Sequence, residues 1–100
     1  MKAVGTISLS PSACIELSAE LAILSDPSRL LLLSLIGRNP HGTCVSDLAA
    51  MADLSVSTAS HHLRKAKRAG LAKSQPAYKM VLYSLTDRGR HWVDLAEESA

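Results

Sequence analysis

The residues best suited to bind another molecule lie in one segment of the second half of the chain. From position 54 to position 71 the sequence reads LSVSTASHHLRKAKRAGL: small hydroxyl residues come first, two histidines follow, and a basic run ends the segment. Hydroxyl and imidazole groups exchange hydrogen bonds with the edges of DNA bases, whereas Lys and Arg neutralise phosphates. Side chains in this order on one helix predict a helix that lies in the major groove of duplex DNA.

Short polar side chains are the candidates for contact with base edges, and cations are the candidates for contact with phosphates. The candidate residues are Ser57, Thr58, Ser60, His61, Arg64, Lys65, Arg68 and Lys79. His62 is not in this set, because it lies beside the apolar stripe of the same helix. We expect His62 to be partly buried and hydrogen-bonded to the backbone.

The charge distribution supports contact with a nucleic acid. No Asp or Glu occurs between Asp53 and Asp87, and the same window contains the bases Arg64, Lys65, Lys67, Arg68, Lys73 and Lys79. The net charge of +2 is therefore the sum of one strongly basic segment and two acidic flanks. Phosphate binding needs local positive charge rather than a high overall charge. A basic run alone is equally typical of a solvated helix face. The prediction of DNA binding therefore also depends on the division of the helix into an apolar and a polar face.

The size and composition indicate one small, helix-rich domain. The chain has 100 residues, of which 47% are apolar, with no Phe, one Trp and two Tyr. Leu, Ile, Val and Ala must therefore form the core, and domains of this size often gain core by pairing with a second copy. No apolar run approaches the roughly 18 residues of a membrane span, and no signal-peptide pattern follows Lys2. We expect a cytoplasmic protein without a membrane partner.

Capping residues and apolar spacing predict the helices that position the basic segment. We expect residues 1–10 to form a flexible arm and residues 11–100 to form one domain. Pro at the first helical position predicts helices that start at residues 11 and 27 and run to 24 and 36. Ser46 with Asp47 is expected to cap a short helix through residue 52, and Ser55 to cap the next one, which Gly70 ends.

The helix that follows Ser55 has one apolar stripe. Val56, Ala59, Leu63 and Ala66 recur at spacings of three, four and three, so they share one face. The polar and basic residues are left on the opposite face. Together with the short helix before it, this arrangement predicts a helix–turn–helix.

The apolar pattern changes after Gly70. Residues 43–45, 71–74 and 80–85 are expected to be strands, and residues 75–79 to join the last two as a hairpin. Thr86-Asp87 would cap a final helix with Trp92, Val93, Leu95 and Ala96 on its apolar side. The predicted fold is mainly α with a small β-hairpin, in the order α-α-α-α-β-β-α. This order is that of a winged helix–turn–helix, in which the hairpin is a wing that touches the DNA backbone through its lysines.

Three segments resemble the ArsR/SmtB family of bacterial winged-helix repressors. They read LSDPSRLLLLSLI, TCVSDLAAMADLSVSTASHHLRKAKRAGL and VLYSLTDRG, and the resemblance covers roughly residues 18 to 89. It implies a homodimer built through the first and last helices, a palindromic operator, and release or remodelling when an inducer binds. It also places Ser57, Thr58, Ser60 and His61 at positions where such proteins read bases.

The resemblance implies two places where a metal inducer binds, and the first is the last helix, where carboxylates and imidazoles of two protomers meet. Asp87, His91 and Asp94 lie at i, i+4 and i+7, so they share one helix face. Dimer symmetry would repeat this set, and such oxygen and nitrogen donors suit nickel, zinc or cobalt. The usual partner histidines further along that helix are missing. The alternative is that Asp87 caps the helix and His91 is solvated.

The second place is the start of the third helix, where two cysteines flank a single residue in the family pattern. Here the segment reads Cys44-Val45-Ser46, so one thiol is replaced by a hydroxyl. Cys14, His41 and Cys44 are an alternative soft-metal or arsenite site. The two cysteines are also an alternative redox switch, provided that their Cα atoms lie within about 7 Å. Buried, inert thiols are the remaining interpretation.

Enzyme motifs are missing from the sequence. There is no Gly-rich phosphate loop, no G-x-S-x-G and no H-E-x-x-H. We therefore expect no enzyme activity and no small-molecule substrate. The expected function is that of a sequence-specific transcriptional regulator, a homodimer on duplex DNA controlled by a transition-metal ion. A winged helix that docks on another protein without an effector is the alternative from a different class.

Overall fold

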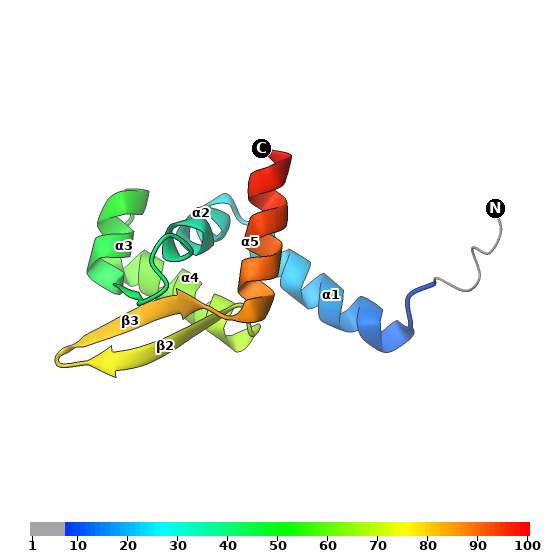
Figure 1. Ribbon diagram of the computed structural model, residues 1–100, viewed down its shortest axis with the longest axis horizontal. Helices are drawn as coiled ribbons and strands as arrows, with labels where there is room; N and C mark the ends of the chain where they lie inside the picture. The colour runs from blue at the N-terminus through cyan, green and yellow to red at the C-terminus, as the bar shows by residue number, and fades with distance from the viewer. Residues whose placement is uncertain (1–7) are drawn as a thin grey trace.

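The computed structural model describes residues 8–100, which fold into five helices and a three-stranded antiparallel sheet (Figure 1). Residues 1–7 of the predicted arm lie outside the described residues. The elements are α1 (Pro11–Leu24), α2 (Pro27–Ile36), β1 (Thr43–Cys44), α3 (Val45–Ala52), α4 (Val56–Arg68), β2 (Ala72–Ala77), β3 (Met80–Leu85) and α5 (Asp87–Ser99). The order of helices and hairpin confirms the prediction. None of these helices is long and apolar enough to cross a membrane.

Side-chain caps start four helices where the sequence predicts them, and the first is α1, where the hydroxyl of Ser10 accepts a hydrogen bond from the backbone N–H of Ala13. A carboxylate oxygen of Asp26 accepts a hydrogen bond from the backbone N–H of Ser28 at 2.9 Å. The hydroxyl of Ser55 accepts one from the N–H of Thr58 at 3.0 Å, and Thr86 caps α5 in the same way. Each cap satisfies a backbone donor that the first turn of a helix leaves unpaired.

The predicted cap of α3 is wrong. This helix begins at Val45, and its N-cap residue is Cys44, which makes no side-chain hydrogen bond to the helix backbone. Thr43 and Cys44 pair with β3, so the chain passes directly from a strand into the helix. Strand pairing therefore fixes the start of α3 without a capping side chain. Asp47 lies in the first turn instead, where a carboxylate interacts favourably with the helix dipole.

The hairpin is longer than predicted. β2 continues past Ser74 to Ala77, so the prediction of a loop over residues 75–79 is wrong. The strand order β1-β3-β2 places β2 at an edge of the sheet, and edge strands tolerate a proline such as Pro76. Only Tyr78 and Lys79 remain as the turn. Tyr78 has a φ of 58° and a fully exposed side chain, so the tip of the wing presents an aromatic ring to solvent.

The core lies where α2, α3 and α5 meet the end of α4 and the base of the hairpin. Leu33, Leu48 and Val93 come from α2, α3 and α5, Leu71 lies between α4 and β2, and each is at most 1% exposed. Burying one such side chain stabilises the fold by about 1.5–3 kcal/mol. α1 is different, because it extends away from this body and contains no buried residue (Figure 1).

The apolar stripe of α4 faces the core. Ala59, Leu63 and Ala66 are at most 1% exposed, as the spacing predicts. Val56 is 52% exposed, so its predicted place in the stripe is wrong. It is the first residue of α4 and lies beyond the edge of the core. Burial of the other three members fixes which face of α4 remains free.

Candidate nucleic-acid interface

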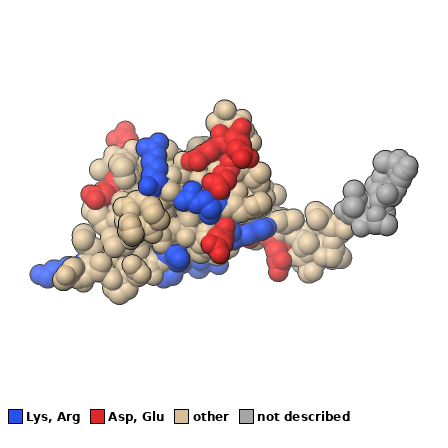
Figure 2. All heavy atoms as spheres, viewed as in Figure 1, with Lys and Arg blue, Asp and Glu red and all other residues tan. Residues whose placement is uncertain are grey.

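The free face of α4 carries most of the predicted DNA contacts. Ser57, Thr58, His61, Arg64 and Arg68 are exposed, whereas Ser60 and Lys65 are half-buried. Lys79 is exposed at the turn of the hairpin. Figure 2 shows Lys and Arg at the tip of the hairpin and along the lower edge of the body, where Figure 1 places the wing and α4. One helix and one hairpin therefore bring the cations to the same side of the molecule.

The first turn of α4 fixes one of the hydroxyls. The Oγ of Ser55 donates a hydrogen bond to the Oγ1 of Thr58 at 2.9 Å and accepts one from the Thr58 backbone N–H at 3.0 Å. Because the Thr58 hydroxyl accepts this bond, its own proton is free to be donated outward. Thr58 is exposed, so an acceptor on a base edge or a phosphate can receive that proton.

The surroundings of His61 favour the neutral imidazole over the protonated form. Partial desolvation lowers the pKa of His61, and the positive charges of Lys65 and of the nearby Arg64 and Arg68 lower it further. A neutral imidazole has one nitrogen that donates and one that accepts a hydrogen bond. His61 can therefore complement either kind of group on a base edge.

His62 is half-buried, as predicted, but the prediction of a backbone partner is wrong. Its Nδ1 lies 3.4 Å from the Nη1 of Arg29, a residue of α2. A guanidinium only donates, so Nδ1 must accept and the proton must lie on Nε2. Arg29 also donates to the carbonyl oxygens of Ile23 at 3.0 Å and Ala22 at 3.3 Å, near the end of α1. His62 thus belongs to the packing of α4 against α2.

Lys67 connects α4 to the wing. Its Nζ donates a hydrogen bond to the Oγ of Ser74 in β2 at 2.8 Å. This bond helps to hold the hairpin beside α4, so Lys67 differs from the other cations of the basic run. Nothing in the spacing of the basic run distinguishes Lys67, because its partner comes from a strand that follows later in the chain.

The candidate metal ligands of α5 do not converge within one chain. Asp87, His91 and Asp94 are all exposed, and the Oδ1 of Asp94 lies 3.5 Å from the Nη1 of Arg90. Among residues 8–100, no three His, Cys, Asp or Glu side chains form a group able to hold a metal ion. Their oxygen and nitrogen donors are of the kind that transition metals bind.

The two cysteines are also separate. Both are free thiols: Cys14 is exposed in the first turns of α1, and Cys44 is half-buried at the start of α3. These two segments lie at opposite ends of the molecule (Figure 1). The alternative site of Cys14, His41 and Cys44, and the disulfide between the two thiols, therefore do not form within one chain. The Sγ of Cys44 instead lies 3.4 Å from the Oγ of Ser46, which occupies the second position of the family's cysteine pattern.

The fold and the exposed polar face of α4 are those of a winged helix–turn–helix, a class of DNA-binding transcriptional regulators and not of enzymes. Residues 26–74 match the family described as bacterial regulatory proteins of the arsR family. The chain belongs to this ArsR family of transcriptional regulators.

Individual relatives agree with this assignment. The chain is 42% identical over 79 residues to a cadmium resistance transcriptional regulatory protein CadC homologue of Staphylococcus aureus, covering 76% of this chain and 60% of the relative. It is 36% identical to the HTH-type transcriptional regulator YgaV of Escherichia coli, covering 70% of each chain. A solved structure of a predicted DNA-binding transcriptional regulator from Escherichia coli superposes with a TM-score of 0.79 at 28% identity, covering 89% of this chain and 94% of that one. The chain spans only about 60% of the length of the Staphylococcus aureus relative.

Proposed function

We propose that this regulator binds a palindromic operator as a homodimer, with α4 in the major groove and the β2–β3 wing against the adjacent backbone. The observation that carries the proposal is the division of α4 into two faces. Ala59, Leu63 and Ala66 are buried, and the opposite face presents hydroxyls, an imidazole and cations to solvent. A recognition helix needs this division, because one face must be fixed to the domain while the other reads DNA.

The surface outside the DNA-reading face supports pairing of two copies. Ile15 and Leu21 of α1 are 71% and 50% exposed, and Leu95 of α5 is 43% exposed. An open apolar groove of about 340 Å³ runs between α2 and α5, where Leu31 and Val93 are among the residues that line it. A second copy that packs on α1 and α5 would cover these side chains, and apolar burial is the main favourable term in such association.

The experiment for this proposal is selection of bound sequences from random duplex DNA, followed by substitution of two residues of α4. We expect His61→Ala to relax the base preference at one position of each half-site, because it removes a contact with a base edge. We expect Lys65→Ala to weaken binding to all duplexes alike, because it removes a contact with a phosphate. Equal loss of selectivity in both variants would contradict this division of roles.

The finer part of the proposal concerns control by a transition-metal ion. The Staphylococcus aureus relative is named for cadmium resistance, and α5 carries Asp87, His91 and Asp94 on exposed positions. In the proposed homodimer, two copies of α5 would supply these carboxylates and imidazoles to one ion. Bound between protomers, the ion would change how the two copies pack and therefore how they fit the operator.

Titration of nickel, zinc and cobalt into the reduced protein tests this control. We expect His91→Ala to weaken binding of the metal at least tenfold, because the imidazole is the only nitrogen donor of the set. His41→Ala is the comparison, since His41 is an exposed histidine of the loop before β1. Unchanged metal binding in His91→Ala would remove α5 as the site, and a loss in His41→Ala would mean that His41 binds the ion instead.

A further inference from the structure

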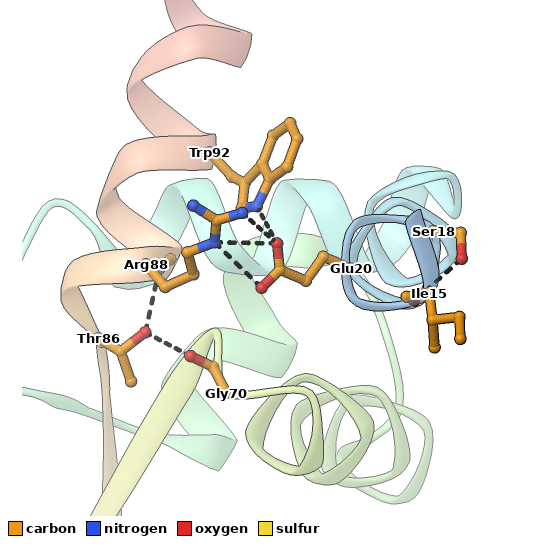
Figure 3. Close-up of polar contacts among 8 residues, drawn as sticks. Ile15, Ser18, Glu20, Gly70, Thr86, Arg88 and Trp92 are labelled. Atoms are coloured by element: carbon orange, nitrogen blue, oxygen red, sulfur yellow. Dashed lines mark hydrogen bonds and ion pairs between the residues drawn. The ribbon is translucent and has the colours of Figure 1, made fainter. Parts of the chain in front are cut away.

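One carboxylate attaches α1 to α5. Figure 3 shows Glu20 of α1 pointing at Arg88 and Trp92, which lie one turn apart on α5. The Nε of Arg88 donates to both carboxylate oxygens, at 2.9 and 3.0 Å, and its Nη2 lies 2.8 Å from Oε1. The indole N–H of Trp92 donates to the same Oε1 at 2.8 Å. We call these three residues the α1–α5 clamp.

The clamp is more enclosed than an ordinary surface ion pair. The side chain of Glu20 is only 14% exposed, although that of Arg88 is 44% exposed. The guanidinium carbon of Arg88 also lies 5.5 Å from the centre of the Trp92 ring, within the range of a cation–π contact. Planar groups that share several bonds in one geometry fix a direction as well as a distance. This matters for α1, because α1 has no fully buried residue. Its other contacts with the body, through Ile23 and Leu24 and the bonds from Arg29, all lie in its last turn.

The same end of α5 is attached to the end of the recognition helix. The Oγ1 of Thr86 donates a hydrogen bond to the carbonyl oxygen of Gly70 at 2.6 Å (Figure 3). The backbone N–H of Thr86 donates to the carbonyl oxygen of Leu71 at 3.2 Å. Gly70 and Leu71 come just after Ala69, the C-cap residue of α4. Two successive contacts, through Glu20 and then through Thr86, therefore connect α1 to the end of α4.

A polar pocket shows how close these three helices come. It lies between α1, the end of α4 and the start of α5, and Glu16, Glu20, Arg68 and Arg88 are among the residues that line it. Arg68 is the last residue of α4 and a predicted phosphate contact. The clamp therefore lies between the helix that exposes apolar residues and the helix that exposes DNA-reading residues.

We propose that Glu20, Arg88 and Trp92 act as positioning residues that set the direction of α1 relative to α4, and thereby the spacing between the two recognition helices of the dimer. The inference rests on the proposed homodimer on a palindromic operator. α1 extends from the body, so a small rotation at the clamp moves the partner subunit by a larger distance, and dimer symmetry repeats the rotation in the other protomer. Half-sites about one helical turn apart require a fixed distance between the two recognition helices.

The test measures affinity for operators whose half-sites are separated by the preferred number of base pairs, one more or one fewer. The wild-type protein discriminates among these spacings, and in Glu20→Ala the discrimination falls about tenfold, because charge-assisted hydrogen bonds are lost in each protomer. Affinity for a duplex with a single half-site stays unchanged, since α4 is intact. Glu16→Ala is the matched control: it removes a carboxylate of the same helix and pocket that has no bond to Arg88 or Trp92.

Charge reversal gives a second readout. Glu20→Arg places two guanidinium groups together and should lose spacing discrimination, whereas the combination of Glu20→Arg with Arg88→Glu restores the ion pair and much of the discrimination. Should Glu20→Ala fail to fold, Trp92→Phe keeps an aromatic ring and removes only the N–H donor. Its expected loss of discrimination is smaller than the tenfold loss of Glu20→Ala, because the bonds from Arg88 to the carboxylate remain.

The outcomes separate the inference from the proposed function. Spacing discrimination that survives Glu20→Ala, or that falls equally in Glu16→Ala, overturns the positioning role. A dimer that dissociates in Glu20→Ala, measured by sedimentation, also overturns it, because the loss of spacing discrimination would then come from loss of the dimer rather than from a changed direction of α1. A wild-type protein that binds operators only as a monomer contradicts the proposed function itself.

Discussion

Replacing Gly89 with Ala is expected to lower the free energy of unfolding by about 3 kcal/mol, at the upper end of what overpacking costs. Gly89 is buried in the first turn of α5, and a Cβ built there would lie 1.9 Å from the carbonyl oxygen of Leu71. The obstacle is backbone, which cannot rotate away as a side chain can. α5 would have to move off the start of β2, and the hydrogen bond from the Thr86 N–H to the same carbonyl would be lost with it.

Gly70→Ala is the matched control for this substitution. Gly70 has a φ of +80°, and nothing lies within 4 Å of the Cβ that alanine would add. Its expected cost is only about 1 kcal/mol, from the left-handed backbone conformation. Urea denaturation of both variants measures the difference. If both lose the same stability, the close approach of α5 to Leu71 is not what makes Gly89 necessary.

The close approach of Gly89 to Leu71 could not be predicted from the sequence, although most helix starts could. Local signals were sufficient for most helices, because Asp26, Ser55 and Thr86 cap the helices that follow them directly. The start of α3 differs from the prediction because a strand pairing with β3, far along the chain, replaces the cap. Nothing near Gly89 in the sequence indicates that Leu71 will lie against it.

In the candidate site, too, features that depend on one helix could be predicted, whereas contacts between elements distant in sequence could not. The exposed face of α4 was predicted, because a stripe at helical spacing depends only on residues within that helix. The bond between Lys67 and Ser74 was not predicted, nor was the contact between Arg29 and His62, which are 33 positions apart. The α1–α5 clamp joins residues 68 and 72 positions apart. Partners so distant in sequence are known only once the helices are packed.

Arg64→Ala is expected to weaken operator binding on the order of a hundredfold, because a homodimer loses two charge-assisted contacts of about 1.5 kcal/mol each. Arg64 is exposed on the free face of α4, and no acidic residue occurs between Asp53 and Asp87. Each lost phosphate contact lowers the slope of log affinity against log salt by about 0.9, so the slope should fall by roughly 1.8. Fluorescence anisotropy of a labelled operator between about 50 and 200 mM salt measures it.

Lys67→Ala is the control for the salt slope of Arg64→Ala. Lys67 lies on the same helix and has the same charge, but its ammonium group is bonded to Ser74 of the wing. We therefore expect the salt slope of Lys67→Ala to stay close to that of the wild-type protein. Equal slopes for the two variants would show that the field of the whole basic segment, rather than individual contacts, neutralises the phosphates. A fall of only about 0.9 for Arg64→Ala would indicate that one recognition helix, not two, contacts the operator.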